Sequence, residues 1–135
     1  MNLSNHAENL IAIWLAGGAA PTVLGTVYLD VHSADPGESN TNNTSVYNTL
    51  TGVTGRKLIT PTSSFFLAVE GIVTNIAEIS LTQSAAAPCT ITHFSIWTSN
   101  TGGTQIYSGA VTTTINVLVG NNVRFAPNSI QITVA

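Results

Sequence analysis

The chain has 135 residues and a formal net charge of −3, and only 7% of its residues are charged, against about 25% in an average soluble domain. Thr, Asn and Ser together supply 45 residues, one third of the chain. Lys and Arg number 3, too few for a nucleic-acid-binding patch, and no run approaches the roughly 18 apolar residues of a membrane span. We therefore expect neither nucleic acid nor membrane as a partner. The neutral polar surface suits a protein held in a larger assembly or one that works outside the cell.

The first predicted element is a helix over residues 4–16, within an N-terminal arm of residues 1–20. Asn5 followed by Glu8 resembles a capping box, with Ser4 as the alternative cap, and Gly17-Gly18 ends the pattern. The apolar residues of this helix recur at spacings of three and four and form a stripe along one side: Leu3, Ala7, Leu10, Ile11 and Trp14. This stripe needs a partner surface, which is either the chain's own sheet or another protein.

The remainder, residues 24–135, is predicted to be β-structure. Val27, Leu29 and Val31 alternate with polar residues in a half-buried strand, and residues 37–55 form a long polar loop. Phe65–Val73 is a nearly continuous apolar run, and Asn100-Thr101-Gly102-Gly103 is a hairpin turn. About eight or nine strands at this spacing favour an antiparallel, jelly-roll-like β-sandwich in a single domain over residues 1–135.

The best candidates for chemistry are Asp30, His32 and Asp35. Asp30 and His32 are two residues apart on one face of a strand, and Asp35 follows at the turn, a spacing that can hold a divalent metal. No further ligands cluster nearby, so a structural interpretation is favoured. In that interpretation Asp35 caps the Pro36-Gly37 turn through its side chain, and His32 forms a hydrogen bond with a neighbouring loop.

The other polar candidates also favour structure over catalysis. His93 is expected to be a hydrogen-bonded histidine at the edge of the core, and Cys89, which lacks a nearby base, a structural thiol. Glu70 and Glu78 are the one acidic pair on neighbouring predicted strands, and Arg56-Lys57 is interpreted as a solvated strand start, with pairing to an acid in an assembly as the alternative. We therefore expect no enzyme activity, no metal and no cofactor.

Several stretches resemble, in order, a family of small structural proteins of tailed bacteriophages. They are the strand and turn of Val27–Glu38 (VYLDVHSADPGE), Asn75–Ser80 (NIAEIS), Thr90–Trp97 (TITHFSIW), and the later Gly102-Gly103, Gly109-Ala110, Gly120 and Phe125-Ala126-Pro127. The resemblance covers about residues 25–134. Ser95 stands where the family often has Gly, and the loop after Glu38 lacks the family's Tyr-Ala-Arg segment.

Members of that family are commonly labelled tail fibre proteins, and similar proteins serve as capsid cement or decoration proteins. The resemblance implies a virion structural protein made in the bacterial cytoplasm, which agrees with the absence of a recognisable signal peptide. We expect a decoration protein on the capsid surface that binds the major capsid protein shell and copies of itself as a homo-oligomer, with a tail fibre or tail-tip protein for host attachment as the alternative. The residues expected to make contacts are Leu10, Ile11, Trp14, Asn42, Tyr47 and Arg56.

Overall fold

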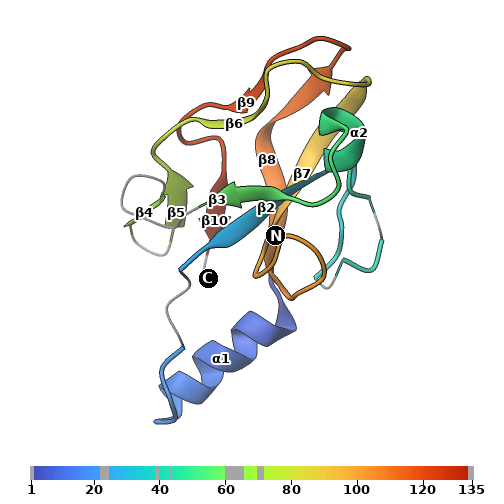
Figure 1. Ribbon diagram of the computed structural model, residues 1–135. Coiled ribbons are helices and arrows are strands. Elements are labelled where there is room, and N and C mark those ends of the chain that lie inside the picture. The colour runs from blue at the N-terminus through green and yellow to red at the C-terminus, as the bar shows by residue number, and fades with distance from the viewer. Residues whose placement is uncertain are drawn as a thin grey trace.

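The structure is a computed structural model of the chain, and it describes residues 2–21, 25–38, 40–42, 44–59, 66–69 and 72–133. A body of antiparallel strands carries one helix that projects from it (Figure 1). In chain order the elements are β1 (Asn2–Leu3), α1 (Asn5–Leu15), β2 (Val27–His32), α2 (Tyr47–Thr51), β3 (Lys57–Ile59), β4 (Phe66–Val69), β5 (Ile72–Asn75), β6 (Ile79–Thr82), β7 (Cys89–Trp97), β8 (Gln105–Val117), β9 (Val123–Phe125) and β10 (Gln131–Thr133).

The described strands form three antiparallel sheets of unequal size. The largest has the order β1-β8-β7-β2-β3, the second the order β10-β5-β4, and the third pairs β6 with β9. The prediction of a mainly antiparallel β fold with an N-terminal helix is confirmed. The jelly-roll-like sandwich is not confirmed, because the two smaller sheets consist of strands of three or four residues and the sheets do not close on one another.

Two further predictions are corrected by tertiary packing. The predicted return strand at Ile106 and the alternation from Val111 are one strand, the 13-residue β8, which pairs with β7 on both sides of a register shift, over Gln105–Ala110 and over Ile115–Val117. The predicted long loop contains helix α2, in which Tyr47 and Leu50 are buried. These two side chains supply the apolar anchor that holds a short helix against β2 and β6.

The core lies among the sheets and includes Leu29, Phe94, Tyr107 and Phe125. Buried Asn75 links β5 to the C-terminal segments: its Nδ2 donates to the carbonyl oxygen of Ala126 at 3.0 Å, and its Oδ1 accepts from the amide of Ile130 at 2.9 Å. A fully buried amide is stable only when its donors and acceptor are all occupied. Asn75 therefore joins small sheets that share no strand.

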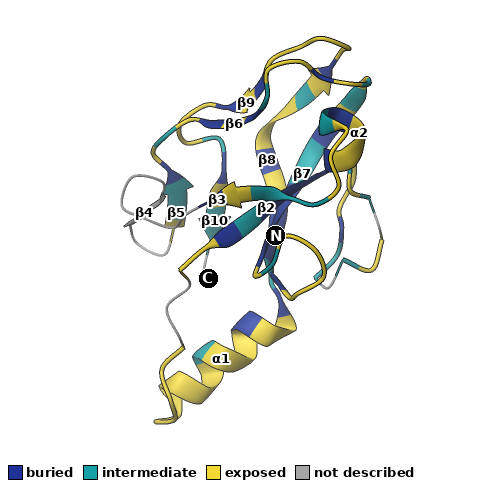
Figure 2. Cartoon of the chain, in the orientation of Figure 1, coloured by how far each residue is buried: buried dark blue, intermediate teal, exposed yellow. Residues whose placement is uncertain are grey.

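Helix α1 is fixed to the large sheet at its first turn. Ser4 caps the helix, because its Oγ accepts a hydrogen bond from the Ala7 amide at 3.2 Å, and the Ser4 amide donates to the Ile106 carbonyl of β8 at 2.8 Å. The structure thus uses Ser4, the alternative cap of the prediction, and Asn5 is the first helical residue. The buried residue of α1 is Ala7, and Figure 2 shows most of the helix as exposed.

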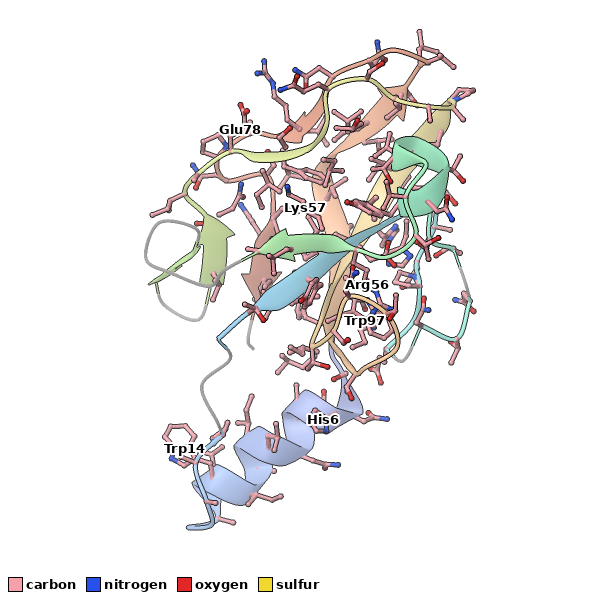
Figure 3. All side chains as sticks on the ribbon, in the orientation of Figure 1. His6, Trp14, Arg56, Lys57, Glu78 and Trp97 are labelled. Atoms are coloured by element: carbon pink, nitrogen blue, oxygen red, sulfur yellow. The ribbon has the colours of Figure 1, made fainter. Side chains whose placement is uncertain are left out.

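The other end of the helix stops at the glycine pair, as predicted. Gly17 has a φ of 88°, a conformation that costs a glycine little. The amides of Gly17 and Gly18 donate to the carbonyls of Trp14 and Ile13 at 3.1 and 2.8 Å, which is the Schellman pattern. The cap fixes the helix end, so the exposed residues of its last turns hold defined positions away from the strands (Figure 3).

Candidate functional site

The first candidate site is the apolar surface of α1. Trp14 remains 54% exposed and Leu15 73% exposed, and Leu10 and Ile13 are exposed as well. Fixed large apolar side chains that gather on one exposed element mark a contact surface more often than chance exposure does. We call the exposed side chains of Leu10, Ile13, Trp14 and Leu15 the helix patch.

A shallow apolar groove adjoins the helix patch. It lies between α1 and the end of the β7–β8 hairpin, has a volume of about 200 Å³, and is lined by Leu3, Ala7, Leu10, Ile11 and Ile106 among others. The predicted stripe therefore divides: Leu3 and Ala7 pack towards β8, Leu10 and Ile11 line the groove, and Trp14 faces outward. The sequence left open whether the helix covers its own sheet or a partner, and in this chain its first turn does the former.

The other three residues expected to make contacts, Asn42, Tyr47 and Arg56, occupy different environments. Asn42 is exposed, and its Nδ2 donates to the carbonyl of Asp35 at 3.0 Å. Tyr47 is buried in α2, and Arg56 is half-buried just before β3. Their participation in an interface stays a prediction.

The second candidate site is a polar cluster that begins at Arg56. Its guanidinium carbon lies 3.7 Å from the centroid of the Trp97 ring (Figure 3), and its Nη1 donates to the carbonyls of Ser99 and Gly102, each at 2.8 Å. Its Nε lies 3.7 Å from Asp30 Oδ2. Arg56 is therefore not the solvated strand start of the prediction: it pairs with an acid of its own chain and clamps the β7–β8 turn.

Burial and charge act in opposite directions on this guanidinium. Burial lowers the pKa of Arg56 from its usual value, and the Asp30 carboxylate raises it in part. A guanidinium starts so far above neutral pH that it stays protonated. Arg56 thus supplies a permanent positive charge beside the buried carboxylate.

A glycine makes this arrangement possible. Gly55 has a φ of 121°, and a Cβ at this position would lie 2.5 Å from Asn100 Oδ1. That same Oδ1 accepts the Arg56 amide at 2.8 Å. The missing side chain therefore allows the loop before β3 to contact the β7–β8 turn.

A hydrogen-bond chain continues from the cluster into the core. Ser95 Oγ lies 2.7 Å from His32 Nε2 and accepts the Trp97 indole N–H at 2.7 Å. On the other side of the ring, Thr44 Oγ1 lies 3.3 Å from His32 Nδ1. The expected hydrogen bond between His32 and a neighbouring loop is confirmed, and so is the cap by Asp35, whose Oδ1 accepts the Gly37 amide at 2.9 Å.

Asp30, His32 and Ser95 are the three residue types of a serine hydrolase, but they are not arranged as one. Asp30 Oδ2 lies 4.0 Å from His32 Nε2, the same ring nitrogen that contacts Ser95. In a hydrolase the carboxylate binds the other nitrogen and so orients the ring. Ser95 and His32 are each 0% exposed, so the hydroxyl is not accessible to a substrate.

The remaining predicted candidates lie apart from one another. His93 is half-buried with its Nδ1 2.8 Å from Thr92 Oγ1, Glu78 lies 3.6 Å from Arg124 at the surface, and Glu70 falls outside the described residues. Burial raises the pKa of the Cys89 thiol, which favours its unreactive protonated form.

Across the described ranges, no three His, Cys, Asp or Glu side chains lie close enough together to hold a metal ion. Neither α1 nor α2 is long and apolar enough to cross a membrane.

Comparison with known families covers nearly the whole chain. The model of a family described as podophage GP4 fiber I protein gp80 matches residues 2–133. The chain belongs to this family. A search of curated proteins gave no match.

Membership in the podophage GP4 fiber I protein gp80 family confirms the resemblance to small virion proteins of tailed bacteriophages. The chain is therefore a structural protein of a phage virion. The matched range includes α1 and the helix patch as well as the strands.

The polar cluster of this family member makes its stability depend on pH. Burial lowers the pKa of His32 from 6.5, with Asp30 and Asp35 opposing that shift and His93 and Arg56 adding to it. Below about pH 6.5 the unfolded chain therefore binds more protons than the folded one, and the free energy of unfolding falls as pH decreases. Urea unfolding between pH 7.5 and 5 should show a slope of at most about 1.4 kcal/mol per pH unit from this residue. A His32→Gln variant that folds should lose this component, and an unchanged slope in the variant would contradict the assignment.

Sequence patterns missed three members of this cluster. Ser95 and Trp97 lie two residues apart on β7 and face the same side as His32 on the adjacent β2, and Ser45 reaches Asp30 Oδ1 at 2.7 Å from the loop. The one available signal was the spacing of Asp30 and His32, which placed two polar side chains on one strand face. That spacing does not predict the register of β2 with β7, which brings Ser95 opposite Asp30.

Proposed function

We propose that this chain is a fibre subunit of a podophage virion that attaches to the rest of the particle through the helix patch. The description of its family as a fiber protein supports the fibre assignment. The observation that carries the attachment is the exposure of Trp14, Leu15 and their neighbours on a helix whose two ends are both capped. A surface that is already ordered by its caps loses less conformational entropy on binding than one that orders only on contact with its partner.

The energetics of α1 also favour a partner. The helix has 11 residues, and isolated helices shorter than about 12–15 residues are marginal in water. Most helix stability in proteins comes from packing of an apolar face, but here that face packs only near Ala7. A partner over the helix patch would supply the missing packing.

We further propose that the role is non-enzymatic. The Ser95 hydroxyl and the His32 ring are fully buried, and the Asp30 carboxylate does not orient the nitrogen that a relay would require. The polar cluster instead joins β2, β7, the loop around Ser45 and the β7–β8 turn. The hydrogen bonds and the ion pair of this cluster therefore hold elements of the fold together.

Capsid decoration is the second candidate. The strands gather in one body with a single projecting helix (Figure 1), and this shape suits a clamp on a shell as well as an appendage. In that case the partners would be the major capsid protein shell and further copies of this chain. The number of copies separates the two: a shell offers lattice sites in the hundreds, and a fibre needs only tens.

The test of attachment compares exposed residues on and off the helix patch. Trp14→Ala should weaken retention of the protein on heated virions by tenfold or more, since an aromatic interface anchor contributes on the order of 2 kcal/mol, and should leave melting of the isolated protein nearly unchanged. Leu15→Ala and Leu118→Ala form a matched pair, because these leucines are 73% and 66% exposed and only Leu15 is on the helix.

Leu118→Ala should retain normal attachment, and Leu15→Ala should not. Equal retention of all three variants, or lowered melting with normal retention for Trp14→Ala, would show that the helix patch is not the attachment surface. Densitometry of purified virions against the major shell protein gives the copy number. Hundreds of copies would replace the fibre assignment with decoration.

A further inference from the structure

The buried ring of His32 connects the large sheet to the loop that follows β2, and attachment through α1 makes no use of this connection. Two described segments of that loop, residues 33–38 and 44–46, are together called the His32 loop. The loop is tied back to β2 by the Val46 amide, which donates to the Val31 carbonyl at 2.9 Å. The ring is 0% exposed, so every hydrogen on it must find its acceptor within the protein.

The neighbours on β7 determine the role of His32 Nε2. An indole N–H can only donate, so Ser95 Oγ accepts from Trp97 Nε1 at 2.7 Å. The hydroxyl's own hydrogen then points to its other partner, His32 Nε2, also at 2.7 Å. His32 Nε2 is therefore an acceptor and carries no hydrogen.

The neighbour in the loop determines the role of the other ring nitrogen. Thr44 Oγ1 donates its one hydrogen to the Ala34 carbonyl at 3.0 Å, so at its contact with His32 Nδ1, at 3.3 Å, it can only accept. The neutral ring thus carries its hydrogen on Nδ1. The hydrogen bonds run in one direction, from Trp97 through Ser95, His32 and Thr44 to Ala34, and each donor in this chain has an acceptor.

A second ring proton does not fit this arrangement. A hydrogen on His32 Nε2 would meet the hydrogen of Ser95 Oγ across 2.7 Å. The hydroxyl would have to turn away and lose its acceptor in a site where Ser95 is 0% exposed, and an unpaired buried donor is costly. When the loop opens, water reaches the ring and supplies the missing partners.

The charged groups that face the ring do not remove this conflict. Asp30 Oδ2 lies 4.0 Å from His32 Nε2, which is longer than a hydrogen bond, and it already pairs with Arg56 Nε at 3.7 Å. Asp35 in the loop favours the charged ring, whereas Arg56 before β3 and His93 on β7 oppose it. Burial outweighs the two carboxylates and lowers the pKa of His32.

We propose that His32 is a pH switch: protonation of its ring releases the His32 loop from β2 and β7 while these strands remain paired. The strands are held together by their own register over Tyr28–His32 and His93–Trp97, which does not depend on the ring. The released part is therefore the loop and not the sheet. The proposal makes no use of the helix patch, so the switch and the attachment can each fail without the other.

Two nuclear magnetic resonance measurements on the unaltered protein test the switch. Two-bond ¹H–¹⁵N spectra of the ring at pH 7.5 should show the hydrogen of His32 on Nδ1, and a hydrogen on Nε2 instead would overturn the proposal. Amide hydrogen exchange of Val46, corrected for its intrinsic pH dependence, should show an opening constant about tenfold larger at pH 5.5 than at pH 7.5. The reason is that an opened loop leaves a ring that binds a proton below about pH 6.5.

Amides in other loops provide the internal control. Those of Ala86 and Gly120 donate to the Leu50 and Ala85 carbonyls at 2.9 and 2.8 Å, and their opening constants should not change over this pH range. An equal rise at these amides would show a general loss of structure, and no rise at Val46 would show that the loop ignores the ring. Either result overturns the proposal.

Two pairs of variants identify the groups responsible. His32→Gln should abolish the pH response, whereas His93→Gln, which changes the histidine directly opposite on β7, should keep it. Thr44→Val removes the loop's contact with the ring and should raise the opening constant at Val46 about threefold to tenfold at pH 7.5, the value of one hydrogen bond. Thr112→Val removes a hydroxyl that also donates to a carbonyl, at 3.3 Å, and should not. Loss of the response in His93→Gln, or unchanged opening in Thr44→Val, overturns the assignment even if His32→Gln does not fold.

Discussion

Arg56→Ala should lower the free energy of unfolding by about 3 kcal/mol. The variant loses two hydrogen bonds to the carbonyls of the β7–β8 turn and the contact with the Trp97 ring. It also leaves Asp30, which is 6% exposed at its side chain, without a neighbouring positive charge, and an unpaired buried charge is costly. Urea unfolding at pH 7 measures the difference.

Two variants separate the parts of this effect. Arg56→Lys keeps the charge but not the planar fork that reaches both carbonyls, so it should recover roughly half of the loss. Arg124→Ala is the matched control, because Arg124 also pairs with an acid, Glu78, but both side chains are about half exposed. Such surface pairs contribute at most about 1 kcal/mol. If Arg124→Ala and Arg56→Ala lowered the free energy of unfolding by similar amounts, the contacts of Arg56 with the β7–β8 turn would contribute no more stability than a surface ion pair.

Ser95→Ala should also be strongly destabilising, by about 2–4 kcal/mol. The hydroxyl serves two buried partners, the Trp97 indole N–H and His32 Nε2, each at 2.7 Å. Removing it leaves both without this contact in a site that water does not reach. Thermal and urea unfolding should agree on the loss, and near-ultraviolet circular dichroism should report a changed Trp97 environment.

Ser108 provides a close control for this experiment. It lies directly opposite Ser95 in the β7–β8 register and is also buried, but its Oγ has a single weak contact, with Gly37 O at 3.5 Å. Ser108→Ala should therefore cost less than about 1 kcal/mol. If the two alanine variants were equally stable, the chain from Trp97 through Ser95 to His32 would have no energetic significance.

The candidate surfaces differ in how far local pattern could reveal them. The spacing of Leu10, Ile11 and Trp14 was enough to predict an amphipathic helix, and its end at Gly17 follows from a residue type that acts on its nearest neighbours. The residue types left the N-cap open between Asn5 and Ser4, and the structure uses Ser4. The polar cluster instead joins Asp30, Arg56 and Ser95, which are distant in sequence. Their contacts depend on which strands pair and in which register, and register is set by the packing of the whole sheet.

The sequence by itself determined the class of this protein: a chain of mostly antiparallel strands with one capped N-terminal helix, resembling phage virion proteins. Alternation and turn residues act over a few positions, so these features can be read locally. Only the tertiary structure decided that β8 is one long strand, that the polar loop contains α2, and that the strands form three small sheets. It also placed Arg56 on Trp97 and left the far half of α1 exposed, because burial is decided by which distant surfaces meet.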